Sequence, residues 1–437
     1  MPFKWPRLPG PFHFMLPGIK LKRWMFLLLF STVVLAVGLG GRLGDSFAPY
    51  RDAFNIRAIQ QAERDVRHFI RSRRSIDLWL IGLGVAGMLF AVRRGYYAIL
   101  AVFFPRRERQ FIRMAYERAR RRRGPKIVAI GGGTGLPNLL TGLKEYTDNL
   151  TAVVTVADDG GSSGRLRRQF RMLPPGDFRN CLVALADAEP LMGRLFQHRF
   201  ARKGELQGHT FGNIFLTALA EVSGDFSHAL AESSRVLAVR GRVLPVTLDL
   251  VTLAARLKDG RTVRGESRIA AAGSPIDRVQ LVPARVRANP DAVKAIAKAD
   301  ILVFGPGSLY TSVVPNLLVP EIPEAVARAR AVKMYVCNIM TEPGETDGYS
   351  AADHVAALQR YLGPRGLNGI VVNVEPPSGR QLARYHAEGA ELIPLDDQRL
   401  DALGVAVVRA RLLAADRHYL RHDPVKLSRA VVKFAVI

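Results

Sequence analysis

Two short apolar runs in this chain each end in a cluster of glycines. They read IVAIGGGTG at residues 127–135 and TVADDGGSSG at residues 155–164. A strand that leads through a glycine-rich turn into a helix is typical of a parallel α/β sheet, in which ligands bind beyond the carboxyl ends of the strands. The two turns therefore predict a ligand site at one edge of such a sheet.

The sequence of residues 126–437 favours this fold class throughout. Strand-like runs alternate with helix-like runs, which is the pattern of a mostly parallel α/β sheet. One stretch differs, because residues 245–267 hold two β-prone arms around Asp259 and Gly260, a hairpin signal. We expect this hairpin to be an insertion that covers the site or joins copies of the chain.

The first glycine cluster suits the binding of a phosphate. Gly132 and Gly133 let backbone amides approach an anion, the start of the next helix adds a positive dipole, and Thr134 adds a hydroxyl. A tight structural turn is the alternative explanation for one such loop alone. However, a third loop repeats the arrangement after a later strand, with Gly305, Gly307 and Ser308. Three loops of this kind in one sheet favour a ligand site.

The second cluster adds two carboxylates, Asp158 and Asp159, followed by Gly160 and Gly161. Paired aspartates among small residues suit three roles: holding Mg²⁺, receiving a ribose hydroxyl, or capping the next turn. The chain has no G-x-x-x-x-G-K-[ST], which excludes a P-loop NTPase. The first cluster also lacks the third glycine of a dinucleotide fingerprint and has Leu136 in its place, which disfavours NAD.

A further polar group lies in GHTFGNIFL at residues 208–216. His209 and Asn213 stand at a helix entrance, where a helix-capping histidine is the simple interpretation and an Asn213 amide that contacts a base or sugar is the functional one. The chain shows no Ser-His-Asp order, no HExxH motif and no cysteine–histidine metal set. Nothing in the spacing indicates a nucleophile.

The first 125 residues have a different character. Apolar runs at 24–41 and 76–92 have basic flanks, so we expect residues 1–104 to form a transmembrane helical hairpin with both ends inside the cell. A cleavable signal peptide is the alternative for the first run. The basic linker at 105–125 is expected to contact anionic lipid headgroups, or else to be plainly solvated. Residues 126–437 would then form a cytoplasmic domain at the cell membrane.

The charge distribution favours a membrane over a nucleic acid. The formal net charge is +25, and residues 1–125 hold 24 Lys and Arg against 7 Asp and Glu. Basic charge beside apolar spans is typical of the cytoplasmic flank of a membrane segment. No nucleic-acid-reading motif accompanies it, so we expect no nucleic-acid partner. The two cysteines, Cys181 and Cys337, form no CxxC and fit a reducing compartment.

Six segments together resemble the gluconeogenesis factor family, a relative of 2-phospho-L-lactate transferase. They are, in order, IVAIGGGTGLPNLLTGLK, VTVADDGGSSGRLR, PPGDFRNCLVAL, GHTFGNIFL, GPGSLYTSVVPNLL and NIMTEPGETDGYS. The resemblance covers residues 126–430 and implies a doubly wound, Rossmann-like fold that binds a UDP-sugar such as UDP-N-acetylglucosamine. It also implies a role in carbon use, cell shape and cell-wall precursor supply. Residues 1–125 look like a membrane-anchored branch of the family.

The same resemblance assigns roles to residues. It implies that the first glycine cluster contacts the diphosphate, that Asp159 or else Asp158 holds a metal, and that Arg421 in YLRHDPVKL reaches the ligand. One functional hypothesis is a ligand-sensing regulator at the membrane, working as a homo-oligomer. The other is an enzyme that transfers a group from a nucleotide-activated donor with Mg²⁺. The absence of a readable nucleophile favours the regulator.

Overall fold

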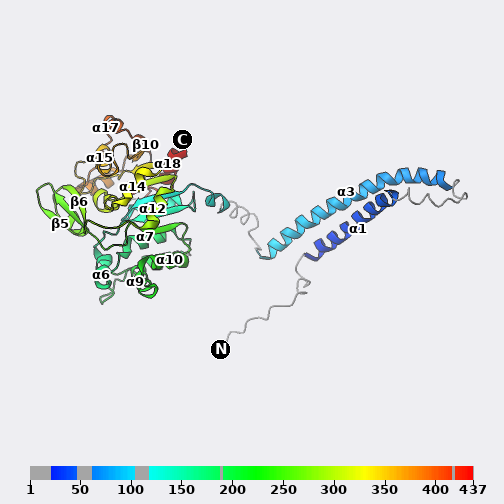
Figure 1. Cartoon of the computed structure of the whole chain (residues 1–437), viewed down its shortest axis with the longest axis horizontal. Helices are drawn as coiled ribbons and strands as arrows, with labels where there is room; N and C mark the ends of the chain where they lie inside the picture. Colours follow the sequence, from blue (N-terminus) through cyan, green and yellow to red (C-terminus); the bar gives the residue numbers. More distant parts are fainter. Residues whose placement is uncertain (1–20, 47–61, 104–117, 188–189, 416–418, 437) are drawn as a thin grey trace, which may run out of the picture. The chain divides into compact units, whose positions relative to one another are not determined.

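The computed structural model describes residues 21–46, 62–103, 118–187, 190–415 and 419–436. The chain divides into two compact units, Met1–Glu117 and Arg118–Ile437 (Figure 1). The boundary falls inside the basic linker expected at 105–125, of which residues 105–117 lie outside the described residues.

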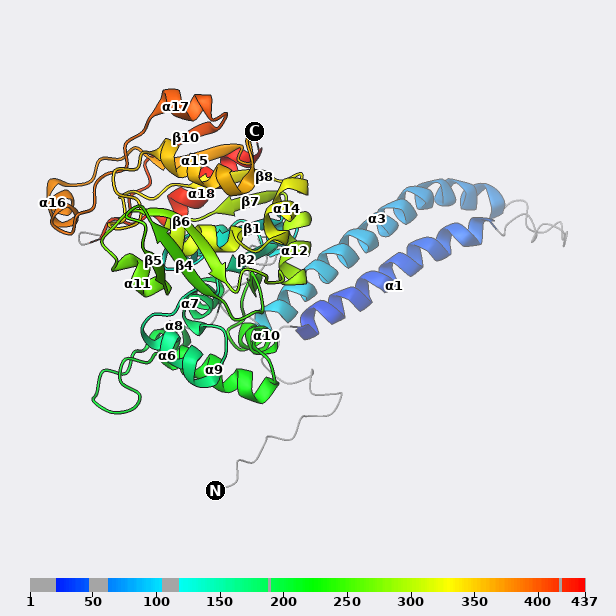
Figure 2. The same ribbon diagram turned by 60° about the vertical axis from the view of Figure 1, so that its left-hand side comes forward.

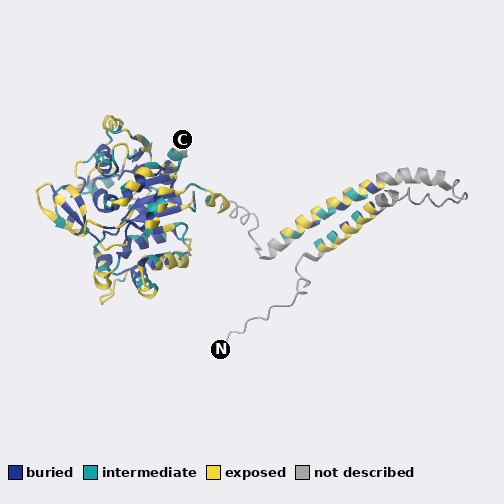
Figure 3. Cartoon of the chain, viewed as in Figure 1, coloured by how far each residue is buried: buried dark blue, intermediate teal, exposed yellow. Residues whose placement is uncertain are grey.

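The described part of the first unit is a pair of helices, α1 (Leu21–Ser46) and α3 (Ala62–Phe103). Small residues let the two backbones approach, because a Cβ on Gly84 of α3 would lie 2.8 Å from the Cβ of Leu35 on α1. A Cβ on Gly87, one turn further along α3, would meet Ser31, one turn earlier on α1, so the helices run antiparallel. Among the side chains whose burial is described, at residues 23–39 and 76–97, most are exposed or half-buried (Figure 3).

The described residues of this unit contain one stretch with the length and hydropathy of a membrane span. Within α3, Ile76–Tyr97 is 22 residues long and apolar enough to cross a bilayer. Within α1, the apolar stretch Arg23–Leu39 is shorter. Both expected apolar runs are therefore helical and packed together, and the described residues contain one helix of spanning length.

The core of the second unit is a seven-stranded, fully parallel sheet with the strand order β10-β9-β8-β7-β1-β2-β3. The inner strands are continuous apolar runs that are buried on both faces, as expected for parallel strands covered by helices. This confirms the α/β class with a mostly parallel sheet. The strands are β1 (Ile127–Gly131), β2 (Leu150–Val154), β3 (Arg242–Pro245), β7 (Ile301–Phe304), β8 (Val332–Val336), β9 (Gly369–Asn373) and β10 (Ala406–Ala410).

Two groups of helices pack against this sheet (Figure 2). In one group α5 contacts α7 and α18; in the other α14 contacts α12 and α15. The helices described in this unit, apart from α11 of the insertion, are α5 (Gly135–Leu143), α6 (Gly161–Phe170), α7 (Pro175–Leu185), α8 (Pro190–Gln197), α9 (Phe211–Ser223), α10 (Phe226–Val236), α12 (Pro290–Ala297), the π-helix η2 (Leu309–Val313), α13 (Val314–Leu317), α14 (Glu321–Arg328), α15 (Ala351–Leu362), α16 (Gly379–Ala387), α17 (Asp397–Ala402) and α18 (Pro424–Val436).

The order in which the sheet is built reverses between β1 and β7. From β1 the chain adds β2 and β3 on one side, and it then returns to place β7 on the other side of β1. In open parallel sheets such a reversal leaves a crevice at the carboxyl ends of the two strands. The first glycine loop follows β1 and the third follows β7, so both lie at this crevice.

The expected hairpin is present and belongs to a three-stranded antiparallel sheet with the order β5-β4-β6. Gly260 has a φ of +89° in the turn between β4 and β5, a conformation that favours glycine. Two details differ from the expectation. Pro245 ends β3 of the large sheet, and the third strand, β6, comes after a short helix, so the turn signal did not reveal it. The elements are β4 (Thr252–Leu257), β5 (Thr262–Arg264), α11 (Glu266–Ala270) and β6 (Ile276–Val282).

The C-terminal helix α18 packs on α5 at a glycine. A Cβ on Gly142 would lie 2.0 Å from the carbonyl oxygen of Pro424, so the contact leaves no room for a side chain. This packing brings the segment before α18 to the end of the sheet where α5 begins. There Asn138 of α5 donates a hydrogen bond to the carbonyl oxygen of His422.

We expect Gly142→Ala to lower the free energy of unfolding of the Arg118–Ile437 unit by about 2 kcal/mol, because the added methyl group displaces the start of α18. Gly193→Ala in α8 is the matched control, since a Cβ there meets no atom within 4 Å, and alanine favours a helix over glycine. Urea unfolding measures both. Equal stability of the two variants would show that α18 does not depend on this contact.

Candidate functional site

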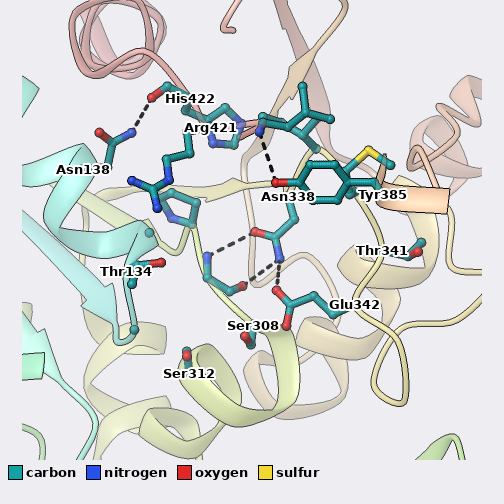
Figure 4. Close-up of a pocket in the computed structure, with 17 residues that line it drawn as sticks. Thr134, Asn138, Ser308, Ser312, Asn338, Thr341, Glu342, Tyr385, Arg421 and His422 are labelled. Atoms are coloured by element: carbon teal, nitrogen blue, oxygen red, sulfur yellow. Dashed lines mark hydrogen bonds between the residues drawn. The ribbon is translucent and has the colours of Figure 1, made fainter. Parts of the chain in front are cut away.

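A cavity of about 250 Å³ lies at the carboxyl ends of β1 and β7 (Figure 4). It is formed by the loops after β1, β7 and β8, by α16, and by the segment before α18. Its lining residues are Gly133, Thr134, Gly135, Asn138, Pro306, Gly307, Ser308, Ser312, Asn338, Ile339, Met340, Thr341, Glu342, Tyr385, Leu420, Arg421 and His422.

The loop after β1 is fixed by a half-buried carboxyl group. Gly133 has a φ of +63°, and its amide donates a hydrogen bond of 2.7 Å to Oδ2 of Asp177 in the first turn of α7. That amide is therefore already used within the protein. Thr134 precedes α5, and its side chain makes no capping bond, so the hydroxyl is left for the cavity. The first amides of α5, beginning at Gly135, have no acceptor within the helix.

The loop after β7 is fixed by one asparagine. Oδ1 of Asn338 accepts a hydrogen bond of 3.2 Å from the amide of Gly307, and its Nδ2 donates to the carbonyl oxygen of Gly307 at 3.1 Å. The same Nδ2 donates to Oε1 of Glu342 at 3.0 Å, and Ser308 also donates to this carboxyl group. These bonds join the loops after β7 and β8 into one wall of the cavity (Figure 4).

The segment before α18 supplies the opposite wall. The guanidinium of Arg421 lies 5.2 Å from the ring centroid of Tyr419 and forms no ion pair with any described residue. In Figure 4 it lies on the Thr134 side of the cavity, across from Glu342. The hydroxyl of Tyr385 accepts a hydrogen bond of 3.1 Å from the amide of Leu420, which fixes the segment to α16.

His422 is a neutral part of this wall. Its side chain is buried, and burial lowers its pKa to about 4. Its Nε2 has no hydrogen-bond partner among the described residues. The ring therefore contributes no charge near neutral pH, and Arg421 supplies the positive charge of the wall.

The aspartate pair lies beside the cavity rather than in it. Oδ1 of Asp158 accepts a hydrogen bond of 2.9 Å from the amide of Gly160, which is a local turn. Oδ1 of Asp159 accepts bonds from the amide and hydroxyl of Ser267, at 3.0 and 2.8 Å, at the start of α11. Asp159 thus ties the second glycine loop to the antiparallel insertion, and Gly161 begins α6.

The described residues contain no preformed metal site. No group of three or more His, Cys, Asp and Glu among them has the arrangement to hold a metal ion. Asp159, the residue expected to hold a metal, has one carboxylate oxygen engaged by Ser267. The arrangement therefore does not fit a resident metal ion held by protein side chains alone.

Carboxyl groups gather between the second glycine loop and the cavity; Glu345 is buried and the others are half-buried. Burial raises the pKa of Asp177 to about 6 and that of Glu266 to about 7, and nearby carboxylates add to both shifts. Burial and the adjacent Glu342 raise the pKa of Glu345 to about 8. Burial also raises the pKa values of Asp158 and Glu342. Part of this group therefore keeps its protons near neutral pH.

Asn213 belongs to an internal network. Its Oδ1 accepts a bond of 3.0 Å from Arg179, and its Nδ2 donates to Oγ of Ser162 at 3.1 Å. His209 contacts the same Ser162 oxygen at 3.0 Å, and it does not cap α9, because Thr210 does. The network joins the start of α6 to the start of α9.

The cavity therefore collects part of the expected set. Gly133, Thr134, Gly307, Ser308 and Arg421 line it. The remaining expected residues lie outside the lining set: Gly132, Asp158, Asp159, Gly160, Gly161, Asn213 and Gly305.

Twelve of the seventeen lining residues were not predicted from the sequence, among them four with polar or aromatic side chains that shape the walls. Asn338 and Glu342 lie in NIMTEPGETDGYS and His422 in YLRHDPVKL, so the segments were noted but these side chains were not. Tyr385 belongs to no motif that was singled out. It is placed by the packing of α16.

We expect Glu345 to make stability depend on pH. Its folded pKa of about 8 exceeds its ordinary value of 4.5, so the folded state holds a proton that the unfolded state loses. Its contribution to the stability of the folded state is fully present below about pH 4.5 and is lost as the pH rises through about 8. Urea unfolding measures this dependence. Between about pH 5 and about pH 8, the free energy of unfolding should fall less for Glu345→Gln than for the parent. The exposed Glu221→Gln should behave as the parent; a Glu345→Gln variant that does the same contradicts the assignment.

The comparisons with known proteins agree with this architecture. A family model described as "2-phospho-L-lactate transferase CofD" matches residues 127–413. The gluconeogenesis factor of Bacillus subtilis (strain 168) is 48% identical over 70% of this chain and 97% of its own length. A relative from Nostoc sp. (strain PCC 7120) is 45% identical over 97% of this chain and 92% of its own.

A solved structure shows the fold as a separate chain. The crystal structure of a protein from Bacillus halodurans has a TM-score of 0.69 and 47% identity, and the match covers 71% of this chain and 100% of that one. A unit of this kind therefore folds without the helical pair. By these matches, the chain belongs to the 2-phospho-L-lactate transferase CofD family and is similar to its gluconeogenesis factors.

Proposed function

We propose that this chain is a regulatory protein that binds a UDP-sugar, with UDP-N-acetylglucosamine as the preferred ligand, in the cavity between β1 and β7. The observation that carries the proposal is the guanidinium of Arg421, which has no ion pair with any described residue and lies on the same side of the cavity as Thr134 and the start of α5. An anion held by a helix start and an arginine is a recurring arrangement for diphosphates.

The diphosphate would take donors from three sources. The first turn of α5 offers backbone amides from Gly135 onward and the positive end of its dipole. Thr134 offers its free hydroxyl, and Arg421 offers a planar pair of charged donors. The amide of Gly133 is excluded from this role, because it is bonded to Asp177.

The neutral parts of the ligand would face the other wall. Glu342 presents a carboxyl group that can accept hydrogen bonds from sugar hydroxyls, and Thr341 adds a polar side chain. The ring of Tyr385 offers a flat apolar face for a base or a sugar. These contacts suit a polyhydroxylated, uncharged group joined to a diphosphate.

A second candidate is a transferase that uses a nucleotide-activated donor with Mg²⁺. The half-buried carboxyl groups of Asp158, Asp177 and Glu266 favour it, because they lie beside the loop nearest the proposed diphosphate. A metal ion there would have to take further oxygens from the ligand's phosphates. The described residues that line the cavity include no hydroxyl paired with a histidine, since the contact between Ser162 and His209 lies in the network outside it. This favours binding over group transfer.

The names of the relatives suggest what the proposed regulatory role is. The Bacillus subtilis protein is named for gluconeogenesis, and we propose that this chain likewise adjusts carbon use, cell shape and cell-wall precursor supply when the nucleotide sugar binds. We also propose that it works as a homo-oligomer anchored to the cell membrane by residues 1–104. The helix Ile76–Tyr97 and the flanking basic segments support the anchor.

Calorimetry of the Arg118–Ile437 fragment tests the ligand. We expect UDP-N-acetylglucosamine to bind and NAD not to bind. Arg421→Gln should weaken binding about 10- to 100-fold through a lost charged hydrogen bond, and Thr134→Ala about 5-fold through a neutral one. Arg285→Gln, an exposed arginine away from the cavity, is the control. Binding of NAD alone would refute the proposal. Release of UDP that depends on Mg²⁺ would favour the transferase.

Cell fractionation tests the anchor. We expect the full chain to sediment with membranes and to resist extraction by high salt, because an apolar span is held by burial rather than by charge. The Arg118–Ile437 fragment should remain in the supernatant. A full chain that high salt releases would be attached by its basic linker only, and the spanning helix would then be wrong.

A further inference from the structure

The outer face of the small antiparallel sheet carries positive charge that plays no part in the cavity between β1 and β7. On β4, Leu253 and Leu257 are buried in the core, whereas Arg256, whose side chain lies on the other face of the strand, is exposed. Arg278 on β6 and Arg264 on β5 are exposed as well. The three arginines come from the three strands of the sheet.

The strand register places two of them directly opposite each other. Arg256, on the central strand, is the Cα partner of Arg278. Directly opposed side chains of an antiparallel pair have Cβ atoms about 4.5–5.5 Å apart, and like charges at that distance repel. Neither arginine has an ion pair or a side-chain hydrogen bond with the described residues. The pair therefore destabilises the sheet unless an anion lies between the guanidinium groups.

A cavity of about 230 Å³ lies at this pair. Its lining consists of Arg256, Gly260, Thr262, Arg278 and Gln280, without a carboxylate. The hydroxyl of Thr262 and the amide of Gln280 add neutral donors to the two charged ones. Two guanidinium groups with such neighbours match the tetrahedral oxygens of a phosphoryl group, which accepts several hydrogen bonds at once.

The charge of this cavity is not neutralised from the adjoining turn. The turn between β4 and β5 contains one carboxylate, Asp259, and Arg261 binds it with a bond of 2.7 Å. The third arginine of the face, Arg264, is the partner of Ala254, two residues from Arg256 on β4. It adds to the positive field without filling the cavity.

We propose that this face is a second anion-binding site, separate from the cavity between β1 and β7, which holds a phosphoryl group between Arg256 and Arg278. The phosphoryl group belongs to a soluble phosphate monoester or to a phospholipid headgroup. The sheet that bears the site also reaches the second glycine loop, because Ser267 of α11 donates to Asp159. An anion bound here thus stabilises the insertion to which that loop is bonded.

Titration calorimetry with glycerol 3-phosphate at constant ionic strength tests the soluble source. The Arg118–Ile437 fragment is used in the Arg421→Gln background, so that the other cavity contributes least. Adding Arg256→Gln and Arg278→Gln should weaken binding at least about 10-fold. The control adds Arg194→Gln and Arg202→Gln, which remove two exposed charges elsewhere. Equal losses in both variants would show a general effect of charge and would overturn the site.

Sedimentation with vesicles tests the lipid source. The same variants are mixed with vesicles of phosphatidylcholine alone and of phosphatidylcholine with phosphatidic acid. Binding to phosphatidic acid that disappears only with the Arg256→Gln, Arg278→Gln pair assigns the headgroup as the ligand. Binding of glycerol 3-phosphate alone assigns the soluble ester. If the pair of substitutions changes neither ligand's binding, the proposal is wrong.

Thermal unfolding gives a readout that does not depend on the choice of ligand. In chloride buffer the fragment with Arg278→Gln should melt about 1 °C above the parent, because the like-charge repulsion is gone. In inorganic phosphate the order should reverse, because only the parent retains both guanidinium groups. The same ranking in chloride and in phosphate would contradict a phosphoryl group between the arginines.

Discussion

The candidate site depends on one close approach between two turns. A Cβ on Gly135 would lie 2.4 Å from the carbonyl oxygen of Pro306, so the start of α5 and the loop after β7 touch backbone to backbone. This contact is available because β1 and β7 are neighbours at the point where the order of the sheet reverses. The segment before α18 then completes the cavity, and the packing of Pro424 on Gly142 holds that segment in place.

The cavity is electrically divided. The start of α5 and the guanidinium of Arg421 make one side positive, whereas Glu342 on the other side belongs to a group of carboxyls whose pKa values are raised by burial. The proposed ligand has the same division, since a nucleotide sugar joins a charged diphosphate to a neutral ring rich in hydroxyls. A dinucleotide of NAD type has a base and ribose at both ends and offers less to the carboxyl wall.

Local patterns predicted most of the sheet, because buried parallel strands such as Ile127–Gly131 are continuous apolar runs ended by glycine. They did not reveal β6, whose partner strand is distant in sequence. For the site, the loops after β1 and β7 were expected to hold a ligand, and both line one cavity. Asp158 and Asp159 lie beside it, because β2 is on the far side of β1 from β7, and strand order across a sheet depends on packing rather than on local sequence. Tyr385 was not predicted either, because the packing of α16, and not a local sequence motif, brings its side chain to the cavity.

Hydrogen exchange of the Arg118–Ile437 fragment, with and without UDP-N-acetylglucosamine, tests the central claim most directly, because protection reports which backbone amides a ligand holds. We expect added protection in four segments, which are the starts of α5 and η2, residues 338–342, and residues 419–423. Protection that appears instead at residues 158–164 and 209–216, with none in these four segments, would contradict it and place the ligand on the β2 side of the sheet.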